Sequence, residues 1–165
     1  MNIPQPIIVN APTKPPATVS VSRVITATPE RLYALISDLP RMGEWSPENH
    51  GGRWMNGASG PATNARFKGK NRNGWRRWST VARVISADPP REFVFVVTSR
   101  GFPVAKWGYV LEPVTGGTNV TETWYDNRST LFAKVTGPVV GVTNRAEYNR
   151  IGMEKTLERL AAAVE

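Results

Sequence analysis

Residues 104–125 read VAKWGYVLEPVTGGTNVTETWY, and this stretch decides the fold class. Large side chains alternate with small or polar ones on both sides of Thr115-Gly116-Gly117, which is the two-residue period of a β-strand. Two alternating runs joined by a Gly-rich turn indicate an antiparallel hairpin. Strand parity then assigns to the interior Trp107, Tyr109 and Leu111 in the first run, and Val120, Glu122 and Trp124 in the second.

The same alternation predicts more strands upstream of this hairpin. Residues 17–27 are expected to form an opening strand, residues 53–55 a short one, and residues 64–70, 75–86 and 91–98 the rest of a meander. Asn73-Gly74 is a strong signal for a tight hairpin. Parity turns further large side chains inward: Phe67, Trp78, Phe93 and Phe95.

Helices are predicted at both ends of this meander. Thr28-Pro29-Glu30 offers an N-cap and a first turn for a short helix that ends near Asp38. Residues 39–50 fit a turn or a second short helix. Residues 127–141 stay ambiguous, because Gly137-Pro138 and Gly141 would break a helix there. From about Thr143 onward, one helical face carries Ala146, Asn149, Met153, Leu157, Leu160 and Val164.

The order of elements predicts a single α+β domain over residues 17–165, preceded by a Pro-rich and flexible tail over residues 1–16. A curved antiparallel sheet of about six or seven strands has one face toward a core. The last helix is the only long element that can cover that face. We therefore expect a sheet wrapped around this helix, with a cavity between the two layers.

Composition excludes several kinds of site. The chain has no Cys and a single His, His50, so thiolate sites, thiol nucleophiles and His-based metal sites are not expected. Phosphate-binding Gly loops and nucleophile motifs are also missing, so we expect neither a metal nor a cofactor. No transmembrane run or signal peptide is visible, which favours a cytoplasmic location. Six Trp residues suggest a core or pocket rich in indoles.

The net charge of +8 is concentrated in one part of the chain. Residues 49–87 contain no Asp or Glu, and their eight cations equal the net charge of the chain: Arg53, Arg66, Lys68, Lys70, Arg72, Arg76, Arg77 and Arg83. Arg66, Lys68 and Lys70 are two positions apart, so they are expected to lie together on the outer face of a strand. Weak attraction to anionic surfaces is expected. Specific nucleic-acid binding is not expected, because no aromatic side chains interleave with the basic ones on that outer face and no known nucleic-acid motif is present.

Short strings along the chain resemble the polyketide cyclase/dehydrase-like branch of the START-like (SRPBCC, birch-pollen-allergen) superfamily, which has the helix-grip fold. These strings are Thr28-Pro29-Glu30 with 35–38, Glu44-Trp45-Ser46-Pro47-Glu48, residues 107–113, residues 116–122 and residues 156–160. The resemblance spans residues 17–165. It implies an internal cavity, with Trp45-Ser46-Pro47 beside its mouth or, alternatively, as a surface loop held by one Trp.

The parity faces and the helical stripe predict the residues of that cavity. Tyr and Trp carry polar atoms that need partners, which suits a cavity wall better than a dry core, although plain core packing remains the alternative. No residue is assigned as catalytic. The expected ligand-binding residues are Trp45, Phe67, Trp78, Phe95, Trp107, Tyr109, Glu122, Trp124, Met153 and Leu157.

Two functions follow as hypotheses. The first is a carrier or sensor that binds a small hydrophobic molecule such as a lipid, polyketide, sterol or aromatic metabolite, as a monomer or weak homodimer. The second is an aromatase/cyclase or dehydratase acting on a polyketide-like chain, with its acid and base drawn from Glu122, Tyr109, Tyr33 and His50. Glu122 contributes only if it faces inward, and a register slip of one residue would turn Thr121, Thr123 and Tyr125 inward instead.

Overall fold

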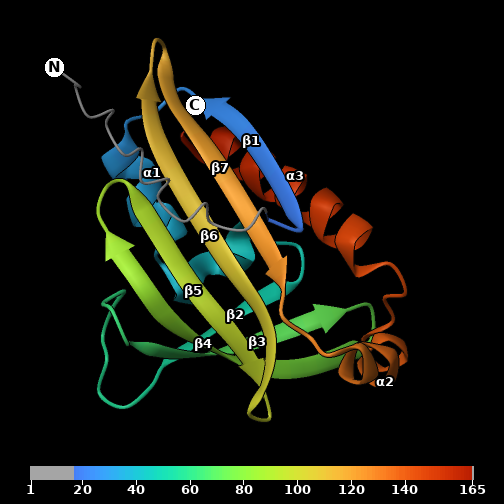
Figure 1. The fold of residues 1–165 in the computed structure, drawn as a ribbon. Helices are drawn as coiled ribbons and strands as arrows, with labels where there is room; N and C mark the ends of the chain where they lie inside the picture. The colour runs from blue at the N-terminus through green and yellow to red at the C-terminus, as the bar shows by residue number, and fades with distance from the viewer. Residues whose placement is uncertain (1–16, 165) are drawn as a thin grey trace, which may run out of the picture.

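The structure is a computed structural model that describes residues 17–164. One seven-stranded antiparallel sheet curves around a long C-terminal helix, as Figure 1 shows. Its strands are β1 (Val19–Ile25), β2 (Asn49–Trp54), β3 (Arg66–Asn73), β4 (Arg76–Asp88), β5 (Glu92–Ser99), β6 (Phe102–Val114) and β7 (Gly117–Asp126). The helices are α1 (Pro29–Ile36), the 3-10 turn η1 (Leu39–Glu44), α2 (Thr130–Val140) and α3 (Arg145–Val164). The helix-grip α+β architecture predicted from the sequence is confirmed, while the predicted tail over residues 1–16 lies outside the described residues.

The sheet is a meander with one return connection. Strands β2 to β7 pair with their neighbours in chain order, and β1 lies on the far side of β7. Register shifts interrupt the pairing between Val84 and Ser86 on β4 and between Val97 and Thr98 on β5. Irregularities of this kind bend a strand and increase its twist. The sheet therefore curls far enough to hold a helix on its concave side.

The short helices begin where their capping residues predict. The Thr28 hydroxyl accepts a hydrogen bond from the Arg31 backbone N–H at 3.3 Å, and Pro29 follows at the first helical position. Helix α1 then packs on β5 and β6. Its buried side chains Leu32 and Ile36 join the main core cluster. One end of the concave face is thus filled by apolar side chains.

Helix α2 contradicts the expectation that Gly137-Pro138 breaks any helix in this region. The Ser129 hydroxyl caps its N-terminus by accepting from the Phe132 N–H at 3.2 Å, and Gly141 ends it in the left-handed conformation at φ 73°. Pro138 lies in the last turn, where one missing backbone donor disrupts little of the helix. Capping at both ends therefore outweighs the two unfavourable residues.

The two faces of the sheet differ as their parity predicts. On β3 the charged side chains Arg66, Lys68 and Lys70 are exposed, while Phe67 is buried. Trp75 departs from the expectation of buried indoles, because it forms the tip of the β3–β4 hairpin and is 82% exposed. The two-residue turn itself is Gly74-Trp75, one position later than Asn73-Gly74. No helix between residues 17 and 164 has the length and apolarity to cross a membrane.

Candidate functional site

A cavity of about 600 Å³ lies between the concave face of the sheet and the N-terminal half of α3. Strands β3 to β7 supply its wall, and α2 together with the segment around Pro47 supplies its sides. Helix α1 fills only the other end of the concave face. Volumes of a few hundred Å³ with mainly apolar walls are typical of small-molecule sites.

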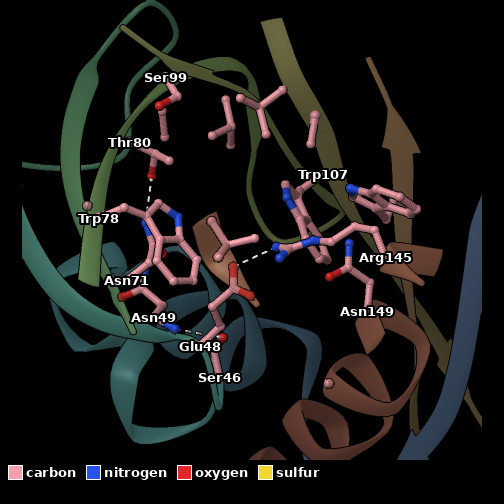
Figure 2. Close-up of a pocket in the computed structure, with 18 of the residues that line it drawn as sticks. Ser46, Glu48, Asn49, Asn71, Trp78, Thr80, Ser99, Trp107, Arg145 and Asn149 are labelled. Carbon is pink, nitrogen blue, oxygen red and sulfur yellow. Dashed lines mark hydrogen bonds and ion pairs between the residues drawn. The ribbon is translucent and has the colours of Figure 1, made fainter. Parts of the chain in front are cut away.

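Aromatic side chains form one wall of this cavity. Phe95, Trp107 and Trp124 occupy neighbouring positions on three adjacent strands, because Phe95 pairs with Trp107 and Trp107 pairs with Trp124 in the register of the sheet. The rings of Trp107 and Trp124 lie 6.4 Å apart at 46°. Trp78 faces them from β4, as Figure 2 shows for Trp78 and Trp107. The arrangement offers flat apolar surface on two sides of a ligand.

Glu122 faces the interior and lies opposite Tyr109 in the β6–β7 register. The Tyr109 hydroxyl donates a hydrogen bond to Glu122 Oε1 at 2.8 Å, while Glu122 Oε2 is buried and has no partner among the described residues. Burial raises the pKa of Glu122 to about 8, although the hydrogen bond from Tyr109 acts in the opposite direction. Burial, together with the Glu122 carboxyl, also raises the pKa of Tyr109 well above its usual value. The predicted inward register is therefore correct.

A second polar cluster lines the side of the cavity nearest the start of α3. Arg145 donates to Glu48 Oε1 at 2.6 Å, and both side chains are largely buried, being 16% and 18% exposed. Arg145 also lies 5.3 Å over the ring of Tyr148, whose pKa is raised chiefly by burial. Figure 2 shows the ion pair of Arg145 with Glu48. Trp78 and Trp107 lie on either side of this pair, and Asn149 lies beside Arg145. Glu48 Oε2 and Asn149 Nδ2 are buried without a partner in the described part of the chain.

This polar cluster was not predicted from the sequence. Asn149 lies on the apolar stripe of α3, and a polar side chain on such a stripe was a usable signal. Glu48 and Arg145 are separated by 97 residues in the chain. Nothing local in the sequence indicates that they meet.

The structure places most of the predicted site residues at the cavity wall. These are Phe67, Trp78, Phe95, Trp107, Tyr109, Glu122, Trp124 and Met153. Trp45 and Leu157 lie elsewhere, both in the main core cluster at 3% and 1% exposure. Both residues lie at the end of the concave face that α1 and η1 fill. The cavity begins further along the sheet, toward the N-terminal half of α3. Ser46 and Pro47, next to Trp45, do reach the cavity wall.

The other two residues considered for acid–base chemistry lie away from the cavity. Tyr33 is buried against Phe93, with ring centroids 6.2 Å apart, and its hydroxyl has no partner among residues 17–164. His50 is exposed and belongs to strand β2, where a turn had been predicted. Within the described residues, no group of three or more His, Cys, Asp or Glu side chains could hold a metal ion.

Solved structures include many with the same fold. The Polyketide_cyc-like protein Cgl2372 from Corynebacterium glutamicum is 31% identical, with a TM-score of 0.56 over 91% of this chain and 90% of that one. Protein CV1439 from Chromobacterium violaceum is 17% identical, with a TM-score of 0.67 over 89% and 96%. The di-domain ARO/CYC StfQ from the steffimycin biosynthetic pathway is 10% identical, with a TM-score of 0.67 over 87% of this chain and 49% of that one.

A comparison with curated proteins finds no match. A family profile described as polyketide cyclase / dehydrase and lipid transport matches residues 16–165, which is nearly the whole chain. Together with the helix-grip architecture and the similarity to Cgl2372, this match identifies the relatives of the chain. The chain belongs to the polyketide cyclase/dehydrase family within the START-like superfamily.

Proposed function

We propose that this protein binds a small, largely apolar molecule in the cavity between the sheet and α3, as a carrier or sensor. The observation that carries the proposal is the combination of an aromatic wall with three buried polar atoms that lack partners: Glu48 Oε2, Glu122 Oε2 and Asn149 Nδ2. A buried polar atom left unpaired costs about 1–3 kcal/mol. A ligand that supplies the missing partners recovers that free energy in addition to the gain from burying apolar surface.

The chemistry of these atoms narrows the ligand class. Glu122 is mostly protonated at neutral pH, because its pKa is raised to about 8. Tyr109 donates to Oε1, so the carboxyl proton belongs on Oε2, which is left as a buried donor without a partner in the described part of the chain. Asn149 Nδ2 is also a donor, whereas Glu48 Oε2 is an acceptor. A ligand with a ring or chain body, carbonyl oxygens and at least one hydroxyl group fits all three.

This ligand class agrees with the family description, which joins polyketide cyclases and dehydrases with lipid transport. A structural relative, StfQ, is named as a di-domain ARO/CYC from the steffimycin biosynthetic pathway. Both point toward oxygenated aromatic or long-chain molecules rather than pure hydrocarbons.

Ligand binding can be tested by making the same Trp→Leu substitution at two positions, one at the cavity wall and one outside it. We expect Trp107→Leu, at the cavity wall, to weaken binding of a hydroxylated naphthyl ketone about tenfold or more, because an aromatic wall residue contributes over 1.4 kcal/mol of contact. Trp75→Leu, at the exposed hairpin tip, should leave the dissociation constant unchanged. Calorimetry measures both values. Equal effects, or no binding by the wild-type protein to any member of a panel of oxygenated aromatics and fatty acids, would reject the proposal.

A second function, an acid–base enzyme of the cyclase or dehydratase type, is favoured by the Tyr109–Glu122 pair. A protonated carboxyl that faces a cavity can protonate a leaving hydroxyl or a carbonyl oxygen. Glu122→Gln keeps the acceptor for Tyr109 but removes the transferable proton. If the protein is an enzyme, this variant should retain ligand binding and lose turnover of a polyketide-like hydroxyketone. Lack of turnover by the wild-type protein over the whole panel favours the carrier or sensor.

A further inference from the structure

The mouth of the cavity can be located from residues that both line it and remain exposed. Four residues meet both conditions: Arg100, Phe102, Val135 and Val139. Arg100 lies in the β5–β6 turn, Phe102 is the first residue of β6, and the last two lie on α2. The other lining residues are buried or half-buried. The cavity therefore opens between this turn and this helix.

Helix α2 carries an apolar face toward solvent at this mouth. Leu131, Val135 and Val139 follow each other at a spacing of four, which places them on one side of the helix. They are 73%, 62% and 66% exposed. Three large aliphatic side chains on one exposed helical face are unusual for a surface that contacts only water.

Two neighbouring turns extend this apolar face. Phe102 is 59% exposed, and its ring lies 5.6 Å from that of Phe132 on α2. Trp75, at the tip of the β3–β4 hairpin, is 82% exposed. The hairpin is tied to the end of α2 by Asn73, whose side-chain amide donates to the Val140 carbonyl at 2.9 Å. We call the set Trp75, Phe102, Leu131, Val135 and Val139 the mouth surface, and Figure 1 shows its three elements at the same end of the molecule.

The charged side chains next to the mouth-surface residues in the chain are cationic. Lys134 lies beside Val135 on α2, Arg100 beside Phe102, and Arg76 beside Trp75, with its guanidinium 4.7 Å over the indole ring. Residues 49–87, 93–111 and 127–146 contain no Asp or Glu. An apolar patch surrounded by cations complements a surface that has an apolar interior and anionic groups at its boundary.

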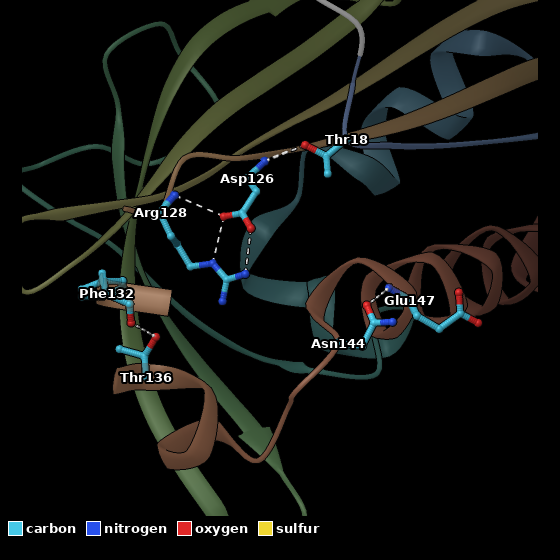
Figure 3. A network of polar contacts seen from close by, with 7 residues as sticks. All are labelled: Thr18, Asp126, Arg128, Phe132, Thr136, Asn144 and Glu147. Atoms are coloured by element: carbon cyan, nitrogen blue, oxygen red, sulfur yellow. Dashed lines mark hydrogen bonds and ion pairs between the residues drawn. The ribbon is translucent and has the colours of Figure 1, made fainter. Parts of the chain in front are cut away.

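The segment that leads from β7 into α2 is held firmly. Arg128 donates to both carboxylate oxygens of Asp126, at 2.8 and 2.7 Å, and Thr18 accepts a hydrogen bond from the Asp126 N–H, as Figure 3 shows. Burial alone would raise the pKa of Asp126, but the bonds from Arg128 hold it below its usual value. The apolar face of α2 is thus presented on a fixed support.

We propose that the mouth surface docks on an anionic lipid bilayer. Docking would seal the opening of the cavity against the apolar interior of the membrane. An apolar molecule could then pass between bilayer and cavity without crossing water. The docking step stands on the surface alone, whereas the exchange step rests on the ligand binding proposed above. The alternative to the bilayer is a second copy of the chain that packs on the same mouth surface.

The experiment measures co-sedimentation of the full chain with two kinds of vesicle: phosphatidylcholine alone and phosphatidylcholine mixed with phosphatidylglycerol. We expect stronger binding to the anionic vesicles. Trp75→Ser combined with Leu131→Ser should lower the partition coefficient about tenfold or more, because two large apolar side chains no longer insert. Lys134→Glu should lower it about tenfold or more on anionic vesicles, since the substitution removes one attractive charge and adds one repulsive charge near the surface. The matched controls on the outer sheet, Val24→Ser and Arg23→Glu, should change little.

Three outcomes overturn the proposal. They are no binding of the wild-type chain to anionic vesicles, equal losses in the controls and the mouth variants, and a dimer in light scattering that the Trp75→Ser/Leu131→Ser variant abolishes. Neither Trp75 nor Leu131 lines the cavity, so binding of the naphthyl ketone probe should survive in this variant. Failure of membrane docking and failure of ligand binding can therefore be told apart.

Discussion

The two halves of α3 face the same sheet but have different neighbours. Its C-terminal half places Leu157 and Leu160 in a packed core, together with Leu32 and Ile36 of α1. Its N-terminal half places Met153 beside Trp124, at a cavity of about 600 Å³. The helical stripe is continuous in the sequence, so the stripe alone does not decide which half is packed. Helix α1 decides it, because it covers only one end of the concave face.

The sharpest test of this contrast compares Leu160→Ala with Met153→Ala. Leu160 is 0% exposed in the core, so its truncation should cost about 2–5 kcal/mol of unfolding free energy. Met153 is 1% exposed but lies at the cavity wall, so we expect Met153→Ala to remove fewer contacts and to cost less. Urea denaturation measures both free energies.

The same two variants should differ in the opposite sense in ligand binding. Met153→Ala enlarges the cavity and should alter which chain length of apolar ligand is accepted, while Leu160→Ala should not. Equal destabilisation with unchanged binding for both would show that Met153 is ordinary core.

Breaking the Arg145–Glu48 ion pair beside the cavity should have the next largest effect on stability. Arg145→Met leaves the Glu48 carboxylate unpaired in a largely buried position and should cost about 1–3 kcal/mol. Combining it with Glu48→Gln should restore part of that loss. The exposed pair Arg41–Glu44 is the matched control, and Arg41→Met should lower the melting temperature much less. A similar loss for Arg41→Met would mean that burial does not distinguish the two pairs.

Glu122 makes the stability of the protein depend on pH in a definite direction. Its folded pKa, about 8, lies above the value of 4.5 expected for an unfolded chain, so the folded state holds more protons between these values. The contribution of Glu122 to stability is thus complete below about pH 4.5 and is lost as the pH rises toward 8, at up to about 1.4 kcal/mol per pH unit. Denaturation at several pH values should show this slope in the wild-type protein and lose it in Glu122→Gln. An unchanged slope in the variant would assign the titration to another group.

The smallest expected effect concerns the cap of α2. Ser129→Ala removes the acceptor for the Phe132 N–H and should cost about 1 kcal/mol of local stability. Hydrogen exchange should become faster in α2 and stay unchanged in α3, because the lost cap bond belongs to α2 alone. Faster exchange in both helices would indicate that the packed and open ends unfold together.

Local patterns predicted the strands and their faces well, because alternation and turn residues act over a few positions. Parity predicted the inward direction of Trp107 and Tyr109, and it favoured that of Glu122, for which a register slip of one residue was the alternative. Helix α2 was not predictable from Gly137-Pro138 and Gly141, which indicate a break, because Ser129 and Gly141 act as its caps in the structure. Contacts between distant segments were not predictable. They include the Glu48–Arg145 pair and the placement of Trp45 and Leu157 beside α1 and η1, which depend on how far α1 extends over the sheet.

The position of β1 has a consequence for the order in which the chain folds. Ser22 on β1 bonds to Thr121 on β7, 99 residues later, so the first strand cannot pair until almost the whole meander has been synthesised. Pairs so distant in sequence form slowly, because a long loop must close first. Strands β2 to β7 can assemble by successive short hairpins before that happens. We therefore expect the apolar side of a half-built sheet to stay accessible until β1 and α3 arrive together.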